Sequence, residues 1–420
     1  SDDDYDKTNI SSKFGFKISE TMNIDAAMRY NDSMVALDDG AFRQDPNRFS
    51  QNEDFNMNAI FNQSLTNWWN QSLKFSFADS DLVSIDRANP GTAETSNTRF
   101  RLDTQIYTGN WQHTLKYKDI DTFVVGFEFE NQSADNRTFD ESLINRGWYF
   151  QNQLKLWDRF FFNAGLRLDD NNTFGKDVNP KLSIAYHLKE TDTKFKANYG
   201  KGFRGPTLNQ LFTFSPPFFF GDPSLQPEES ESFDLGFEQY LFDDKFFFGV
   251  TYFNNRFSNL IQFVNTSGFV WEAQNLGIVR AEGIEAEAVI KPFEGFTIRG
   301  TFTKTNTRDG EKRELDRQPR KQGSVNINYS FLDKFNINVD DTIVGNSRDS
   351  QSVGGVAPPN RPRIRTNTGV HKLDTALSYD YSEHLQLYTR AENVLNIQYD
   401  EILGFRAAGA RFFFGVKLSM

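Results

Sequence analysis

Residues 411–420, at the end of the chain, alternate between two kinds of side chain. One set of positions is apolar throughout: Phe412, Phe414, Val416, Leu418 and Met420. The other set includes Arg411 and Lys417. Because successive side chains of a β-strand point to opposite faces, this period of two predicts a strand with one apolar face. Segments 123–130, 160–169 and 246–253 repeat the pattern, so we expect an all-β chain.

Short polar turns interrupt the alternation along the whole chain. They lie at residues 19–21, 66–67, 119–121, 158, 190–192, 243–244, 292–294, 333–334 and 382–383. Between them run long hairpins whose other ends are extended loops, as at 206–229, 306–317 and 346–369. Short turns on one side and long loops on the other are typical of outer-membrane β-barrels, whose short turns face the periplasm. Residues 1–420 are therefore predicted to form about nineteen antiparallel strands of one transmembrane β-barrel domain.

A soluble β-sandwich or β-propeller with its aromatic face turned inward would show the same alternation. The unequal turns, the hairpin length and the apolar final strand favour the barrel. The mean hydropathy of -0.61 fits a barrel with a polar lumen and polar loops, although the chain contains 44 phenylalanines. The net charge of -11 argues against a nucleic-acid partner, and without cysteine the chain has no disulfide or thiolate site.

Several segments in order resemble the TonB-dependent outer-membrane receptors. They are "NPKLSIAY" (179–186), "NYGKGFRGPTLNQLF" (198–212), "GDPSLQPEESESFDLGFE" (221–238), "YFNNRFSNLIQF" (252–263), "NLGIVRAEGIEAEA" (275–288) and the final segment 387–420. The chain looks most similar to the cobalamin-receptor branch of this family. The resemblance implies a 22-stranded barrel filled by an N-terminal plug, which imports a scarce nutrient with energy relayed from the inner membrane by TonB.

The start of the chain departs from the family pattern. Residues 1–30 resemble the loop that leads into the fourth barrel strand, and nothing in the sequence matches the family's plug or energy-coupling box. Three missing strands added to the nineteen counted here would complete the family's 22. We therefore expect a barrel that is incomplete at its N-terminus, whose plug and first strands a second polypeptide could supply. An odd-stranded closed barrel, with its first and last strands parallel, is the alternative.

Acidic residues flank the first predicted hairpin. Asp2, Asp3, Asp4 and Asp6 precede its first strand, and Asp38 and Asp39 follow its second. Both groups are expected close together on the extracellular side, where clustered carboxylates suit a hard cation such as calcium. In the cobalamin-receptor branch calcium orders the substrate-binding loops, and the resemblance carries its ligand positions onto Asp2, Asp4 and Asp39. A solvated acidic loop is the alternative.

The segment "GKGFRG" (200–205) matches the G-x-G-x-x-G pattern of dinucleotide sites. A proline follows at once and no βαβ context surrounds it, so we interpret the glycines as the end of a strand. The loop that follows contains "SPPFFFGDP" (215–223). Candidate ligand contacts in it are Arg204, Phe218, Phe219 and Phe220, because aromatic rings stack on flat or apolar ligands. The phenylalanines could equally form a small core of the loop.

Charged residues on the polar faces of predicted strands are candidates for the lumen. They are Glu128, Glu130, Arg167, Glu285 and Glu287. In a lumen they would form hydrogen bonds with the plug or line a water-filled path. Their simplest role is to line the barrel wall in contact with water. Trp68, Trp69, Trp111 and Trp157 lie at or near short turns, as an interfacial aromatic girdle requires.

We expect an active importer of a metal chelate, with cobalamin favoured over a ferric siderophore or haem. A passive porin-like channel and a surface adhesin or phage receptor are the alternatives. No enzyme is expected, because His113, His187, His371 and His384 are scattered without a metal-binding or catalytic spacing. The expected partners are outer-membrane lipid, the chelate and, through a plug, TonB.

Overall fold

The structure is a computed structural model that describes residues 4–37, 45, 47–88, 97–215, 219–267, 270–349, 365–402 and 405–419. Nineteen of its strands form one sheet, which confirms the predicted all-β barrel and its strand number. Each predicted short turn falls between two consecutive strands of this sheet. The described helix α1 spans Leu208–Phe212, and no described helix has the length and apolar character needed to cross a bilayer.

The chain divides into two compact units. The first contains residues 1–184, 199–231 and 257–278, and the second contains residues 185–198, 232–256 and 279–420. Four strands have residues in both units: β9 (Gly175–Leu188), β10 (Thr193–Arg204), β13 (Glu228–Leu241) and β14 (Phe246–Ser258).

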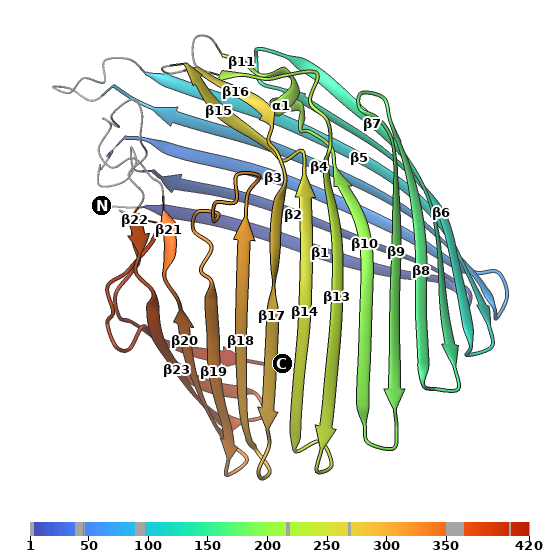
Figure 1. The fold of residues 1–420 in the computed structure, drawn as a ribbon, viewed down its shortest axis with the longest axis vertical. Helices are drawn as coiled ribbons and strands as arrows, with labels where there is room; N and C mark the ends of the chain where they lie inside the picture. The colour runs from blue at the N-terminus through green and yellow to red at the C-terminus, as the bar shows by residue number, and fades with distance from the viewer. Residues whose placement is uncertain are drawn as a thin grey trace. The chain divides into compact units, whose positions relative to one another are not determined.

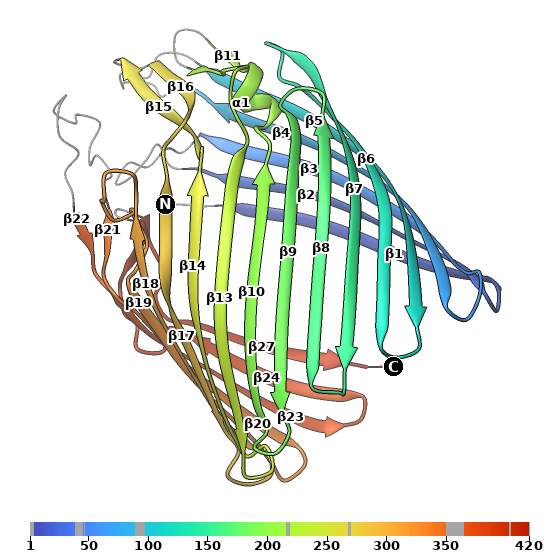
Figure 2. The ribbon, with the colours of Figure 1, turned by 45° about the vertical axis from the view of Figure 1, so that its right-hand side comes forward.

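The first unit is built on eight consecutive antiparallel strands. They are β1 (Tyr5–Ser19), β2 (Met22–Ala36), β3 (Phe49–Ser64), β4 (Trp69–Asp86), β5 (Thr98–Tyr117), β6 (Asp121–Asp135), β7 (Asp140–Leu156) and β8 (Phe160–Asn171). Each pairs with the next over nearly its full length, side by side in Figures 1 and 2. We call the ends joined by short turns the turn end and the opposite ends the loop end.

Short elements gather at the loop end of this unit (Figure 1). They are α1, β11 (Phe214–Ser215), β12 (Phe219–Phe220), β15 (Ile261–Ser267) and β16 (Val270–Asn275). The four short strands form their own sheet. We call the described part of residues 205–227 and 259–275 the apical layer.

The second unit repeats the antiparallel design. Its strands are β17 (Val279–Ile290), β18 (Phe296–Arg308), β19 (Lys321–Phe331), β20 (Phe335–Val344), β23 (Val370–Ser382), β24 (Leu385–Glu392) and β27 (Arg411–Leu418), each paired with the next in this order. Two small hairpins accompany them, β21 (Ser347–Asp349) with β22 (Arg365–Asn367) and β25 (Asp400–Ile402) with β26 (Phe405–Arg406).

Local chemistry explains the tight turns. At the β7–β8 turn, Trp157 and Asp158 have φ values of 54° and 53°, and at the β19–β20 turn Leu332 and Asp333 have 53° and 54°. Two consecutive left-handed residues are the conformation of type I′ turns, whose twist matches that of paired strands. Aspartate tolerates this region better than most residues, which is why polar turns could be located in the sequence.

The strands keep apolar side chains on an exposed face rather than in a central core. On β27 the predicted apolar face is confirmed, since Phe412, Phe414, Val416 and Leu418 are all exposed. The buried apolar cluster lies instead around the apical layer: Ala134, Leu143, Leu208, Leu211, Leu225, Ile261 and Ala273. An apolar outer face is stable in a membrane, where the hydrocarbon replaces a packed partner.

Candidate functional site

A capping box starts the helix of the apical layer. The backbone amide of Gln210 donates to the Thr207 hydroxyl at 3.2 Å, and the backbone amide of Thr207 donates to the side-chain oxygen of Gln210 at 2.9 Å. This exchange satisfies two amides that a helix start would leave unbonded. Leu208 and Leu211 then lie on one side of the helix and are each only 1% exposed. The T-x-x-Q signal was present in the sequence, although no helix was predicted there.

The two loops of the apical layer are joined by strand pairing. In β12 and β16, Phe219 lies beside Trp271 and Phe220 beside Glu272 in parallel register. At their bases, Asn275 accepts from the Gln226 amide and donates to the Gln226 carbonyl, both at 2.8 Å. Because residues far apart in sequence bond through backbone and amide groups, the layer is a built structure and not a pair of independent loops.

Close backbone contact fixes the path from α1 to β12. The Gly221 amide donates to the Thr213 carbonyl at 2.8 Å. A Cβ at Gly221 would lie 2.8 Å from the Gln210 carbonyl oxygen and from the Leu211 carbonyl group. Only glycine fits this approach without displacing the helix.

A cavity of about 560 Å³ lies at the loop end of the first unit. Its lining residues come from the apical layer and from the neighbourhood of β3, β4 and β5: Arg48, Ser84, Asp86, Thr98, Arg99, Phe100, Asn209, Thr213, Ser215, Phe219 and Phe263. Phe219 and Phe263 meet edge to face, with ring centroids 6.0 Å apart. Aromatic faces beside two guanidinium groups and several hydroxyls suit a small ligand with flat, apolar and anionic parts.

Of the predicted ligand contacts, Phe219 lines this cavity and is 45% exposed. Phe220 packs against Phe214 instead, with centroids 5.6 Å apart. Arg204 pairs with Glu228 at 3.4 Å and is not among the lining residues. Phe218 lies outside the described residues. The loop therefore lines a cavity with Phe219 and forms a small aromatic contact with Phe220, and ligand contact by these residues stays a prediction.

Three of the predicted lumen residues lie together on the polar face of the first unit. The Arg167 guanidinium donates to Glu128 at 2.8 Å and holds Asp169 through bonds of 2.8 to 3.1 Å. Asp169 is 2% exposed and also accepts from the Asn145 amide at 2.8 Å. Glu130 lies two residues from Glu128 on the same face. A buried carboxylate held by a bidentate arginine and an amide makes this wall rigid.

Glycines leave room for long side chains on this face. Tyr149 lies across Gly126, where a Cβ would be 2.3 Å from its ring. Its hydroxyl thereby reaches Asn110 at 3.1 Å and Gln112 at 3.2 Å, two strands away. These contacts depend on the register of three strands, which alternation alone does not reveal.

The other two lumen candidates belong to the second unit. Glu287 on β17 forms a salt bridge with Arg299 on β18 at 2.5 Å. Glu285 is exposed two residues away on the same face. Their role in a wet path stays a prediction.

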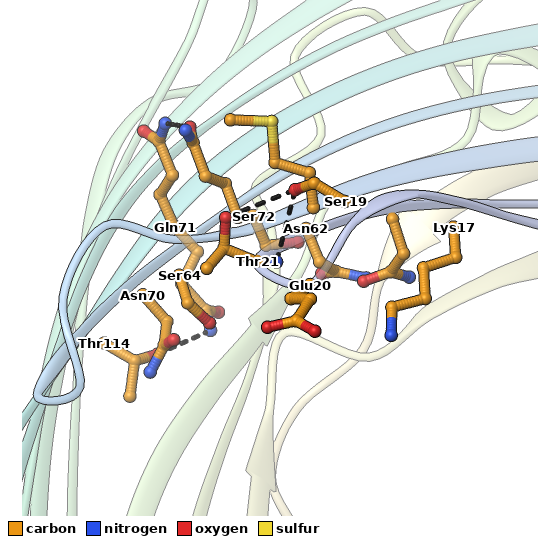
Figure 3. A pocket seen from close by; sticks show the side chains of 14 residues that line it. Lys17, Ser19, Glu20, Thr21, Asn62, Ser64, Asn70, Gln71, Ser72 and Thr114 are labelled. Atoms are coloured by element: carbon orange, nitrogen blue, oxygen red, sulfur yellow. Dashed lines mark hydrogen bonds between the residues drawn. The ribbon is translucent and has the colours of Figure 1, made fainter.

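A second cavity, of about 630 Å³, lies at the turn end of the first unit (Figure 3). Hydroxyl and amide side chains from neighbouring strands dominate its lining, among them Ser19, Asn62, Ser64, Asn70, Ser72 and Thr114. Lys17 and Glu20 add single charges. Such a lining offers many hydrogen-bond donors and acceptors to water or to a polar solute.

The predicted calcium ligands are only partly described. Asp4 and Asp6 are exposed at the start of β1, and the Ala36 amide at the end of β2 donates to the Asp4 carbonyl at 2.9 Å. The hairpin thus brings Asp4 beside the end of β2. Asp2, Asp3, Asp38 and Asp39 lie outside the described residues. Among the residues that are described, no three potential ligands form a metal-binding group, and calcium stays a prediction.

Comparison with known proteins agrees with the fold. The model of the family "TonB dependent receptor-like, beta-barrel" matches residues 1–394. The vitamin B12 transporter BtuB of Photobacterium profundum is 24% identical over 415 residues, which cover 95% of this chain and 62% of that protein. BtuB of Vibrio vulnificus is 27% identical over 60% of this chain and 38% of its own length. The chain therefore spans less than two thirds of these relatives.

Solved structures show the same fold at lower identity. A mutant of the ferric enterobactin receptor PfeA from Pseudomonas aeruginosa superposes with a TM-score of 0.81 at 14% identity, covering 99% of this chain and 70% of that one. The copper transporter OprC superposes with a TM-score of 0.82 at 15% identity, covering 99% and 72%. The siderophore receptor PirA from Acinetobacter baumannii gives a TM-score of 0.81 at 14% identity over 99% and 71%.

Proposed function

Because this chain belongs to the TonB-dependent receptor-like β-barrel family of the bacterial outer membrane, we propose that it is the barrel of an energised importer. Its loop end would then face the medium and its turn end the periplasm. The importer would draw its energy from TonB through a plug domain. Its cargo would be a scarce metal chelate.

The observation that carries this proposal is the cavity at the loop end of the first unit. It lies on the side from which cargo would enter, and residues from α1, β12 and β15 form part of its lining. Its volume of about 560 Å³ is within the range of small-molecule sites. A larger chelate would bind through one face or one side group rather than by complete enclosure.

We favour cobalamin as the cargo. The support is the match to one vitamin B12 transporter over 95% of this chain, together with aromatic rings that could cover a flat macrocycle. A ferric siderophore is the second candidate, because the guanidinium groups of Arg48 and Arg99 outnumber the one carboxylate of the lining, Asp86, and would favour an anionic chelate. The 45% exposed ring of Phe219 is a contact for either cargo.

Titration of the intact receptor with cobalamin, ferric catecholate, ferric hydroxamate and haem tests the proposal. We expect saturable binding of cobalamin, weakened about fivefold by Phe219→Ala because a stacked ring contributes about 1 kcal/mol. Phe75→Ala is the matched control, since Phe75 is also 45% exposed but lies on the apolar face of β4. Binding of an iron chelate without binding of cobalamin would reverse the choice of cargo. If Phe219→Ala leaves the affinity unchanged, the cavity is not part of the binding site.

A further inference from the structure

Four cations gather on one face of the second unit, near the loop ends of β17, β18 and β19. They are Arg280, Lys304, Arg308 and Lys321, here called the basic patch, and all four are exposed. The strand register places Arg280 directly opposite Arg308 and Lys304 directly opposite Lys321. Like charges directly opposite each other destabilise a sheet. Two such pairs on adjoining strands call for a counter-charge.

The basic patch lies on the apolar face of these strands. Phe302 is two residues from Lys304 on β18, and Ile284 is directly opposite Lys304. Both apolar side chains are 45% exposed. The other face is polar: the hydroxyls of Thr301 and Ser324 are bonded at 2.9 Å. The basic patch therefore continues the surface that would contact lipid.

The position of the basic patch along the strands is the second clue. Two residues of a strand cover about 7 Å, so Lys304 lies about that far beyond Phe302. Arg308 lies a further four residues along, or about 13 Å. Lipid headgroups begin where the apolar band of a membrane protein ends. The basic patch thus covers the headgroup depth.

The neighbouring carboxylates do not neutralise these cations. Glu282 lies on the same face opposite Asn306 and accepts from the Asn254 amide at 3.4 Å. It offsets at most one of the four charges, and Arg256, two residues beyond Asn254 on β14, adds another cation. In the adjoining loop, Asp309 is engaged by Arg313 and Glu314 by Arg320. Within the described part of the chain, no carboxylate forms an ion pair with the basic patch.

The first unit contains a like-charge pair of the opposite sign. Asp81 on β4 lies directly opposite Asp103 on β5, which is also a like-charge pair. There Arg101 lies between them, 2.9 Å from Asp81 and 3.6 Å from Asp103. The protein supplies its own counter-ion to that pair. At the basic patch the counter-ion must come from outside the described chain.

We propose that the basic patch binds the phosphate groups of an anionic lipid of the outer leaflet. A phosphate between Arg280 and Arg308, or between Lys304 and Lys321, would turn each repulsive pair into two charge-assisted contacts. Phe302 and Ile284 would lie against the start of the acyl chains. The lipid is favoured over a soluble anion because the basic patch directly adjoins the apolar band.

The test measures retention of lipid by the purified full chain. The protein is placed in phosphatidylcholine nanodiscs that contain a bisphosphorylated disaccharide lipid, and native mass spectrometry counts the lipid that stays bound. We expect Lys304→Gln combined with Lys321→Gln to reduce retention at least tenfold, at about fivefold per cation. Lys291→Gln with Lys334→Gln is the matched control, because both lysines are exposed in turns at the opposite ends of these strands.

Three further readings decide the outcome. In lipid-free neutral detergent the Lys304/Lys321 variant should be at least as heat-stable as the parent, since repulsion is relieved, and this separates lost binding from misfolding. The same lipid without its phosphates should be retained no better by the parent than by the variant. Equal retention of the phosphorylated lipid by parent and variant overturns the proposal. So does complete displacement of that lipid by millimolar inorganic phosphate, which would indicate a site for free anions.

Discussion

Arg167 on β8 donates to Glu128 on β6 at 2.8 Å although β7 runs between the two strands. Gly147 makes this possible, because it lies on β7 opposite Glu128 on one side and opposite Asp169 on the other. A Cβ at Gly147 would be 2.4 Å from the Arg167 Nη2 atom. Three strands are thus connected by one side chain on the polar face, in addition to their backbone ladder.

Replacement of Gly147 by alanine should break this bridge. The new methyl group displaces the Nη2 end of Arg167, which weakens the bonds from this atom to Glu128 and Asp169. We expect a loss of about 1–2 kcal/mol in the free energy of unfolding, as for a partly exposed charged hydrogen bond. Urea titration in detergent measures it. Gly109→Ala is the control, since no atom lies within 4 Å of a Cβ there. Equal destabilisation by both changes would contradict the role of the bridge.

Replacement of Gly221 by alanine should disturb the apical layer and leave the strands intact. The added Cβ meets backbone atoms of Gln210 and Leu211 at 2.8 Å, and backbone cannot move aside as a side chain can. We expect weaker binding of cargo with an unchanged urea midpoint of the barrel. Gly277→Ala, at a position with nothing within 4 Å, should bind normally. Normal binding by Gly221→Ala would show that the layer tolerates the shift.

The loop between β18 and β19 should lose order in acid. Burial raises the pKa of Asp309, but hydrogen bonds from the backbone and side chain of Arg313 outweigh it and hold that pKa below its ordinary value. A hydrogen bond from Arg320 lowers the pKa of Glu314. Carboxylates with depressed pKa values stabilise the fold above their ordinary values, 3.8 and 4.5, and this stability is lost as the pH falls through the lowered ones.

Hydrogen exchange of residues 309–320 between pH 6 and pH 2.5 checks this, after correction for the intrinsic pH dependence of exchange. We expect protection to fall below about pH 4. Asp309→Asn with Glu314→Gln should remove most of that dependence, because neither amide side chain titrates. The same acid profile in parent and variant would assign the transition to other groups.

Calcium should protect the acidic ends of the first hairpin. We expect the carboxylates that flank β1 and β2 to repel one another until a cation binds, so calcium should slow proteolysis within residues 1–6 and 38–44. Magnesium is the control ion, because its smaller octahedral shell fits a carboxylate cluster less readily. Asp4→Asn with Asp39→Asn should abolish the protection. Proteolysis that is insensitive to calcium would leave these residues as a solvated acidic surface.

The sequence by itself determined the strands, their turns and their apolar face. These properties depend on neighbours within a few residues: Phe412 and Phe414 share a face because they are two apart, and Asp158 marks a turn because it accepts a left-handed backbone. The capping box of Thr207 and Gln210 was an equally local signal for α1. The resemblance of successive segments to TonB-dependent receptors identified the family for the same reason, since it was carried by contiguous motifs.

Only the tertiary structure decided which residues meet across strands. Phe219 and Phe263 share a cavity, Gly147 admits Arg167 to Glu128, and Arg280 faces Arg308, although each pair is separated along the chain. These meetings depend on the pairing register, and a slip of one residue would turn every side chain to the other face. Register is set by the summed packing and hydrogen bonding of whole strands, so no local pattern specifies it.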